Sequence, residues 1–244
     1  MAPQSLTRAA RMILVGAPGV GKGTQSERLM ARYPQLSAIA AGDLVRAAVK
    51  NKTKIGIAAE AVIKTGGLIP DASIISLIVA EMRAKNWISG PGGGSMADAL
   101  ERKTNVSDDP QASFILDGFP RTDAQARKLD ELIPINFVVS LVTPVDIILE
   151  RIAGRWVHEA SGRVYNTGFN APKVPGKDDI TGEPLIQRED DSEATWRARL
   201  KKFDETSQPL LEHYDKKGLL WTVSGNSSDE ISPQLFAEIE KRFC

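Results

Sequence analysis

One stretch near the start of the chain, G-A-P-G-V-G-K-G-T at 16–24, combines residue types that bind phosphate. Its glycines let the backbone curl until successive N–H groups point into one concavity, and a helix beginning there adds the positive end of its dipole. Lys22 is placed to reach the outer phosphates as a point charge. The alternative, a glycine-rich surface turn, explains neither the lysine nor the apolar run before it. The spacing departs from the general phosphate-loop pattern in one respect, because Gly23 separates Lys22 from Thr24.

A second group of chemically capable residues follows another apolar run, Phe114 to Leu116. Asp117 ends this run, and Arg121 comes four residues later. In an open parallel sheet, ligands bind beyond the carboxyl ends of the strands, so we expect both side chains to face the crevice at the phosphate loop. A carboxylate there suits Mg²⁺ or its bound water. The alternatives are a turn cap for Asp117 and a surface ion pair for Arg121.

Apolar periodicity and turn residues define the elements that must position these groups. Short buried runs predict strands at 12–16, 36–40, 114–117, 137–142 and 219–223. Helical spacing predicts helices at 25–33, 55–64, 144–154 and 192–217, a further helix from Asp123 and a terminal helix carrying Phe243. Asp43 and Asp71 are expected to be the N-caps of two more helices. Strands that alternate with helices in this way predict an α/β fold built on a parallel sheet.

Two stretches break the alternation. The segment 89–112 contains G-P-G-G-G-S and S-D-D-P, and we expect a surface insertion there that is flexible at least in part. A regulatory or partner-binding role is the less favoured alternative to a tolerated loop. The segment 156–191 is rich in glycine, proline and charge, and its length predicts a small β-rich excursion with a functional role.

Composition narrows the class of protein. The chain has 244 residues, 42% of them hydrophobic and 25% charged, values typical of a globular protein with one core and no membrane span. Its 31 basic and 31 acidic side chains cancel, so nucleic acid and anionic membranes are disfavoured as partners. Cys244, the single cysteine, excludes a disulfide framework within one chain. No acidic residue precedes Glu27, as in organelle-targeting segments, although a strand beginning by Met12 leaves little room for one.

Several stretches together resemble the adenylate kinase family of nucleoside monophosphate kinases. The matching motifs are G-A-P-G-V-G-K-G-T at 16–24, G-D-L-V-R at 42–46, L-D-G-F-P-R-T-D-A-Q at 116–125, S-G-R-V-Y-N at 161–166, D-D-I-T-G-E-P-L-I-Q-R-E-D-D at 178–191 and R-A-R-L at 197–200. The resemblance implies an α/β P-loop kinase fold with a central parallel five-stranded sheet flanked by helices. It divides the chain into a core at 1–39, 70–153 and 192–244, a helical monophosphate-binding flap at 40–69 and a β-rich lid at 154–191. The insertion at 89–112 lies in the core and has no counterpart in the family pattern.

The resemblance also implies roles for individual residues. The positions matching the catalytic cations are Lys22, Arg121, Arg155, Arg188 and Arg199. Those matching the donor-nucleotide site are Gly19, Val20, Gly21, Lys22, Gly23, Thr24, Arg151, Arg155, Val164 and Tyr165. Those matching the AMP site are Ala41, Arg46, Leu68, Ile69, Gly118, Arg121, Gln125, Arg188 and Arg199, with Gln125 reading the adenine edge. Two phosphate chains need several converging cations, and arginine suits them because its planar fork binds phosphate oxygens bidentately.

In the lid, the motifs imply hydrogen bonds at positions where many relatives carry zinc-binding cysteines. His158, Ser161, Asp178 and Thr181 resemble the polar quartet of the zinc-free lid, so no structural zinc is expected. Mg²⁺ is expected to arrive with the nucleotide, held through phosphates and water near Asp117, Asp43 and Thr24.

The branch of the family that the chain resembles most implies the donor nucleotide and the cellular location. The segment G-R-W-V-H-E-A-S-G-R-V-Y-N at 154–166 is closest to the mitochondrial GTP:AMP phosphotransferases. We therefore expect a monomer in the mitochondrial matrix that interconverts GTP, AMP, GDP and ADP, with neither nucleic acid nor membrane as a partner. The alternatives are an ATP-preferring adenylate kinase, a cytoplasmic location, and a nucleotide-binding switch with vestigial activity. Ala41 stands where relatives usually carry Ser or Thr, so any hydroxyl contact to AMP is absent there.

Overall fold

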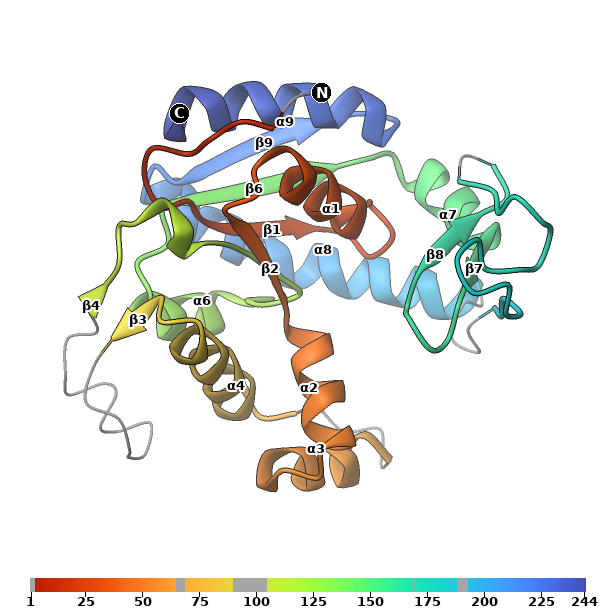
Figure 1. The fold of residues 1–244 in the computed structure, drawn as a ribbon, viewed down its shortest axis with the longest axis horizontal. Helices are drawn as coiled ribbons and strands as arrows, with labels where there is room; N and C mark the ends of the chain where they lie inside the picture. Colours follow the sequence, from red (N-terminus) through yellow and green to blue (C-terminus); the bar gives the residue numbers. More distant parts are fainter. Residues whose placement is uncertain (1–2, 65–68, 90–104, 169, 188–192) are drawn as a thin grey trace.

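The computed structural model describes residues 3–64, 69–89, 105–168, 170–187 and 193–244. Its centre is a sheet of five parallel strands in the order β2-β5-β1-β6-β9 (Figure 1), which confirms the predicted fold class. Each predicted strand is present, and its ends differ from the prediction by one residue at most. The strands are β1 (Arg11–Gly16), β2 (Leu36–Ala40), β5 (Ser113–Asp117), β6 (Phe137–Val142) and β9 (Leu220–Ser224).

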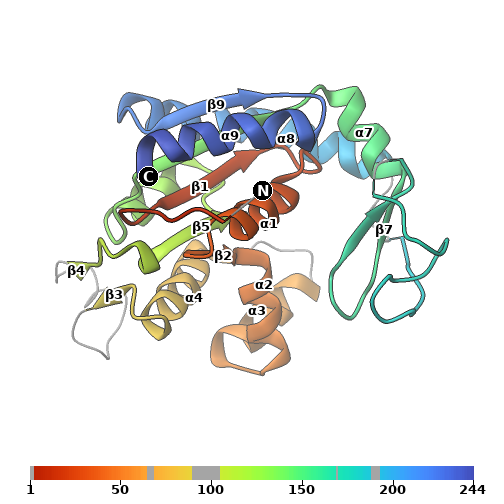
Figure 2. The same ribbon diagram turned by 45° about the horizontal axis from the view of Figure 1, so that its top comes forward.

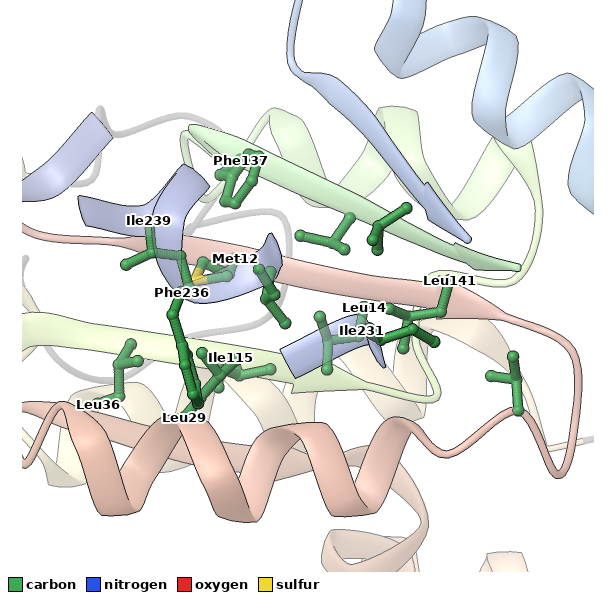
Figure 3. Close-up of a cluster of buried hydrophobic side chains, with 14 of the residues drawn as sticks. Met12, Leu14, Leu29, Leu36, Ile115, Phe137, Leu141, Ile231, Phe236 and Ile239 are labelled. Atoms are coloured by element: carbon green, nitrogen blue, oxygen red, sulfur yellow. The ribbon is translucent and has the colours of Figure 1, made fainter. Parts of the chain in front are cut away.

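Helices cover both faces of this sheet because the central strand is apolar on both sides. Met12 and Leu14 point into a core cluster that includes residues of α1 and α9, drawn in Figure 3. Ile13 and Val15 belong to a second cluster on the opposite face, shared with α4 and α6, and α8 contributes to both. The bounds are α1 (Lys22–Arg32), α4 (Asp71–Ala84), α6 (Asp123–Asp130), α7 (Val145–Ala153), α8 (Glu193–Lys216) and α9 (Ser228–Phe243).

The carboxyl ends of the five strands form one edge of the sheet, because all five run in the same direction. β1 lies in the middle, and the chain first builds β2 and β5 on one side of it before crossing to β6 and β9 on the other. In register, Leu14 of β1 lies beside Asp117, the last residue of β5. Open α/β sheets bind ligands outside such a point of reversal, so the expected crevice lies at the ends of β1 and β5.

Two helices, α2 (Ala41–Lys50) and α3 (Lys54–Lys64), stand apart from the sheet (Figures 1 and 2). They pack so closely that a Cβ added at Gly56 would overlap the backbone carbonyl of Ala48. The expectation that Asp43 caps α2 is wrong, because β2 runs directly into the helix and Asp43 lies in its first turn. Asp71 likewise is the first residue of α4, and Pro70 holds the cap position.

The excursion expected at 156–191 contains β7 (Arg155–Val157) and β8 (Val164–Asn166), which pair antiparallel beside α7, at the right of Figure 1. A bridge between Val157 and Ile186 extends this pairing. Short strands joined by polar turns give the segment little apolar area to bury, so its interior has to be polar, as described below.

Short regular elements occupy both described ends of the insertion expected at 89–112. β3 (Ile88–Ser89) pairs antiparallel with β4 (Asn105–Val106), and a short 3-10 helix, η1 (Pro110–Ala112), leads into β5. Trp87, next to β3, is buried and stacks on Phe114 of β5 with ring centroids 5.7 Å apart, which anchors this ribbon to the core. Residues 90–104 lie outside the described part of the chain. Within the described part, the helices lack the combination of length and apolar character needed to cross a membrane.

Candidate active site

The glycine-rich loop joins β1 to α1 at the middle of the sheet's carboxyl edge. Gly19 and Gly21 have φ angles of 82° and 103°, a region that residues with a side chain rarely adopt, so glycine is needed at both positions. α1 begins at Lys22, and its first turn carries no acidic residue. The start of the helix therefore offers backbone N–H groups and a positive dipole end without a competing carboxylate, which suits a phosphate group.

The side chain of Lys22 forms hydrogen bonds with the backbone of this loop. Its Nζ donates hydrogen bonds to the carbonyl oxygens of Gly16, at 2.8 Å, and Ala17, at 3.1 Å. Burial lowers the pKa of the Lys22 amine, the carboxylate of Asp117 opposes this shift, and the guanidinium of Arg121 adds to it. The loop thus holds a positive charge that is poorly solvated, and such a charge interacts more strongly with an anion than one in bulk water.

Asp117 lies at the end of β5, close to this charge. Burial raises the pKa of the Asp117 carboxyl, Lys22 and Arg121 oppose the shift, and Asp43 of α2 reinforces it. These influences require proximity, so the structure brings together four charged groups that the sequence placed in three separate motifs. The cluster sits at the carboxyl edge of the sheet, where the crevice was expected.

The oxygen donors of this cluster fit Mg²⁺. Asp117 and Asp43 supply carboxylates to the cluster, and Thr24, in the first turn of α1 two residues after Lys22, carries a hydroxyl. Over the residues that the structure describes, no group of three or more His, Cys, Asp or Glu side chains is arranged to hold a metal ion. A magnesium ion at this place therefore needs phosphate oxygens and water to complete its coordination.

Two of the arginines expected near AMP hold contacts within the protein. Arg46 on α2 is largely exposed and forms an ion pair with Asp43, one turn earlier in the same helix. Arg121, in the loop after β5, donates from Nε to the carbonyl of Gly118 at 2.8 Å. Both guanidiniums keep further N–H groups, because arginine has five and these contacts use only part of them.

The other positions expected at the AMP site are placed as follows. Ala41 is buried at the start of α2, and Ile69 is half-buried just before α4. Gln125 lies on α6, and its side-chain amide bonds to the backbone N–H of Arg121 and to the carboxylate of Asp71. The sequence did not indicate Asp71 as a site residue, because its contact joins positions 54 apart in the chain. Leu68 and Arg188 lie outside the described residues.

Arg151 lies against the back of the phosphate loop. It donates to the carbonyl oxygen of Val20 at 3.2 Å and to that of Asn226 at 2.7 Å, and burial lowers the pKa of its guanidinium. It thereby ties α7 to the loop and to the segment before α9. In the lid, Val164 is exposed, whereas Tyr165 is buried with its hydroxyl directed at Asp178, so its ring contributes to the lid interior.

The two remaining arginines, Arg155 of β7 and Arg199 of α8, meet on one aromatic ring. Their guanidinium carbons lie 5.0 Å and 5.1 Å from the ring centroid of Trp196, which is buried. Such cation–π contacts help to hold both guanidiniums in place. Trp196 was not identified from the sequence, because one tryptophan at the start of an amphipathic helix is typical of a core residue.

Asp178 is the centre of the polar network inside the lid. Its side chain is fully buried and accepts hydrogen bonds from Arg163 at 2.6 Å and 2.8 Å, from the Tyr165 hydroxyl at 2.9 Å and from the Thr181 hydroxyl at 2.9 Å. The Arg163 bonds, followed by the backbone N–H of Thr181, hold the pKa of Asp178 far below its usual range. The charge of Asp178 is therefore balanced inside the lid.

His158 extends this network. Its Nδ1 lies 2.7 Å from the hydroxyl of Ser161, and its Nε2 lies 2.5 Å from a carboxylate oxygen of Glu183. The four residues expected in the lid thus lie together, and Arg163 and Glu183 join them. Both additional residues fall inside the motifs noted above, but nothing in their spacing distinguishes them from other charged surface residues.

Comparison with known proteins gives a consistent result. The adenylate kinase family model matches residues 14–90, and the model of the adenylate kinase active site lid matches residues 155–190. A "GTP:AMP phosphotransferase, mitochondrial" from Saccharomyces cerevisiae strain S288c is 44% identical over 203 residues, covering 81% of each chain. A second Saccharomyces cerevisiae protein of that name is also 44% identical over 203 residues, covering 81% of this chain and 78% of its own. The phosphate loop, the charge cluster and these matches agree, and the chain belongs to the adenylate kinase family.

Proposed function

We propose that this enzyme transfers the γ-phosphoryl group of a magnesium nucleoside triphosphate, GTP in preference to ATP, reversibly to AMP. The observation that carries the proposal is the cluster of Lys22, Asp117 and Arg121 at the end of the phosphate loop. The names of the two yeast relatives supply the donor and the acceptor. Their names also support a mitochondrial location for this chain, in preference to the cytoplasm.

The reaction needs little covalent chemistry from the protein. An oxygen of the AMP phosphate attacks the γ-phosphorus in line, the bond to the β–γ bridging oxygen breaks, and GDP and ADP leave. Negative charge spreads over the transferred group and the bridging oxygen, so catalysis consists of alignment and charge neutralisation. No histidine or cysteine nucleophile is required.

Each charged residue has a proposed part in this scheme. Lys22, with the N–H groups of the loop, binds the β- and γ-phosphates of the donor, and Arg46 and Arg121 bind the phosphate of AMP. Arg155 and Arg199, both held on Trp196, approach the transferred group when the lid closes and water is excluded. Mg²⁺, held by the donor phosphates near Asp117, Asp43 and Thr24, would neutralise further charge.

A donor and acceptor panel tests the proposal. Initial rates of diphosphate formation are measured with GTP, ATP and ITP as donors against AMP, UMP and CMP as acceptors. We expect AMP to be the preferred acceptor and GTP the preferred donor. A preference for ATP over GTP would overturn the donor assignment, and no ADP from GTP and AMP would favour a nucleotide-binding switch with vestigial activity.

A further inference from the structure

The side-chain amide of Gln125 is held at both of its polar ends. Its oxygen, Oε1, accepts a hydrogen bond from the backbone N–H of Arg121 at 2.7 Å. Its nitrogen, Nε2, donates to the Oδ1 of Asp71 at 2.7 Å. Asp71 opens α4 and Gln125 lies in the first turn of α6, and the two helices share the core cluster on one face of the sheet (Figure 1). Gln125 is half-buried, and its bond to Asp71 is partly shielded from water, whereas its bond to the Arg121 N–H is exposed.

These two partners admit only one orientation of the amide. A carboxylate accepts hydrogen bonds and a backbone N–H donates them. Turning the amide by 180° would place its oxygen against the Asp71 carboxylate and its NH₂ group against the N–H of Arg121. Both hydrogen bonds would be lost and two repulsive contacts would replace them. The orientation is therefore fixed by the protein before any nucleotide binds.

One hydrogen on Nε2 and one lone pair on Oε1 remain available, since an amide has two of each. A base bound to them must offer an acceptor to the nitrogen and a donor to the oxygen. Adenine does so with N1 and its 6-amino group. A 6-oxo purine such as hypoxanthine presents the reverse pattern, an N1–H donor and an O6 acceptor, and would meet like groups.

We propose that Asp71 is a positioning residue that fixes the Gln125 amide and so makes the acceptor site select 6-amino over 6-oxo purine monophosphates. The inference deepens the proposed function and rests on it for the role of Gln125. Without Asp71, only the hydrogen bond from the Arg121 N–H to Oε1 would oppose turning the amide, so the amide could turn at lower cost to suit either base. Selection then comes from the unfavourable pairing imposed on the wrong base as well as from the bonds made to the right one.

Two simpler roles for these residues are helix capping by Gln125 and a favourable helix charge from Asp71. Neither role requires the observed hydrogen bond between the two side chains. Thr122 and Gln125 have the spacing of a capping box, and the Thr122 hydroxyl accepts from the Gln125 N–H at 3.3 Å. A capping role uses only the Gln125 oxygen and leaves Asp71 without a function. Asp71 could also act as a favourable negative charge at the start of α4, and any carboxylate in a first helical turn would do this equally well.

The test compares AMP with IMP as acceptors in Asp71→Asn, where the new amide can either donate to Gln125 or accept from it. Asp146→Asn is the matched control, because Asp146 is exposed in the first turn of α7 and its loss removes the same helix charge. We expect the ratio of kcat/KM for AMP to that for IMP to fall about tenfold in Asp71→Asn, the value of one hydrogen bond, mainly through KM. The ratio in Asp146→Asn should stay within about twofold of the wild type.

An unchanged ratio in Asp71→Asn, or an equal fall in the control, would overturn the proposal. If Asp71→Asn does not fold, Asp71→Ala tests the same point, since it also removes the acceptor that holds Nε2. Failure of the proposed function would appear separately, as no ADP from GTP and AMP in the wild type. In that case the dissociation constants of AMP and IMP are measured by calorimetry on the same variants. The ratio of the two dissociation constants then tests the role of Asp71 in place of the ratio of kcat/KM values.

Discussion

Replacing Lys22 by methionine removes one charge at the phosphate loop while keeping a side chain of similar length. In the structure the ammonium group lies 2.8 Å and 3.1 Å from two loop carbonyls, is half-buried and is close to Asp117. A unit charge 4 Å from a phosphate oxygen contributes about 4 kcal/mol at an effective dielectric constant of about 20. Loss of one transition-state contact of this kind costs roughly 2.7–4 kcal/mol, which corresponds to a fall of about 10²–10³ in kcat.

Stability should change much less than activity. Burial lowers the pKa of Lys22, so the charged amine costs the folded state free energy below that pKa, and the cost disappears as pH rises towards the unfolded value. Methionine removes this cost together with the two hydrogen bonds to the loop. The two effects oppose each other, and we expect the free energy of unfolding to change by less than about 1 kcal/mol.

The assay is ADP formation from GTP and AMP at saturating concentrations of both, with thermal unfolding of the same samples. Lys128→Met is the control, because Lys128 is an exposed residue of α6 outside the site, and its kcat should stay within about twofold of the wild type. The reasoning is refuted if Lys22→Met keeps more than about a tenth of the wild-type kcat. If only the KM for GTP changes, Lys22 braces the loop without stabilising the transition state.

Three further predictions concern the flap, the loop and the lid. Gly56→Ala should push α2 away from α3 and lower the free energy of unfolding by roughly 1–3 kcal/mol. It should also raise the KM for AMP but not the KM for GTP, and an unchanged KM for AMP would contradict this prediction. In urea unfolding, Gly21→Ala should lower the free energy of unfolding by about 1–2 kcal/mol, because φ at this position is 103°. Gly23→Ala should raise it by up to about 1 kcal/mol, because no described atom lies within 4 Å of the new Cβ and alanine favours the helix. If both substitutions change the free energy of unfolding in the same direction, the argument is refuted. The pKa of Asp178 is lowered in the folded state, so its stabilisation is present above the unfolded pKa of about 3.9 and decreases as pH falls below it. The difference in melting temperature between wild type and Asp178→Asn should therefore shrink below about pH 4, and a constant difference would exclude the ion pair with Arg163 as its source.

Local patterns were sufficient to predict the sheet and the phosphate loop. Strands buried on both faces appear as continuous apolar runs, as in β1, β5 and β6. The edge strands β2 and β9 are less buried but still mainly apolar, and all five strands could be found within one residue of their ends. Glycine at positive φ, as at Gly19 and Gly21, follows from the chain's own sterics and needs no distant partner. The start of α2 was misjudged because β2 runs into it without a turn, so the helix needs no side-chain cap at Asp43.

The sequence by itself therefore determined the fold class, the phosphate loop and the family. The tertiary structure decided which side chains act on one another: Asp71 on Gln125, Trp196 on the arginines Arg155 and Arg199. The physical reason is that periodicity and backbone preference depend on neighbours within a few residues of the chain. A contact between two helices depends instead on how both pack against the sheet and which rotamers that packing leaves open.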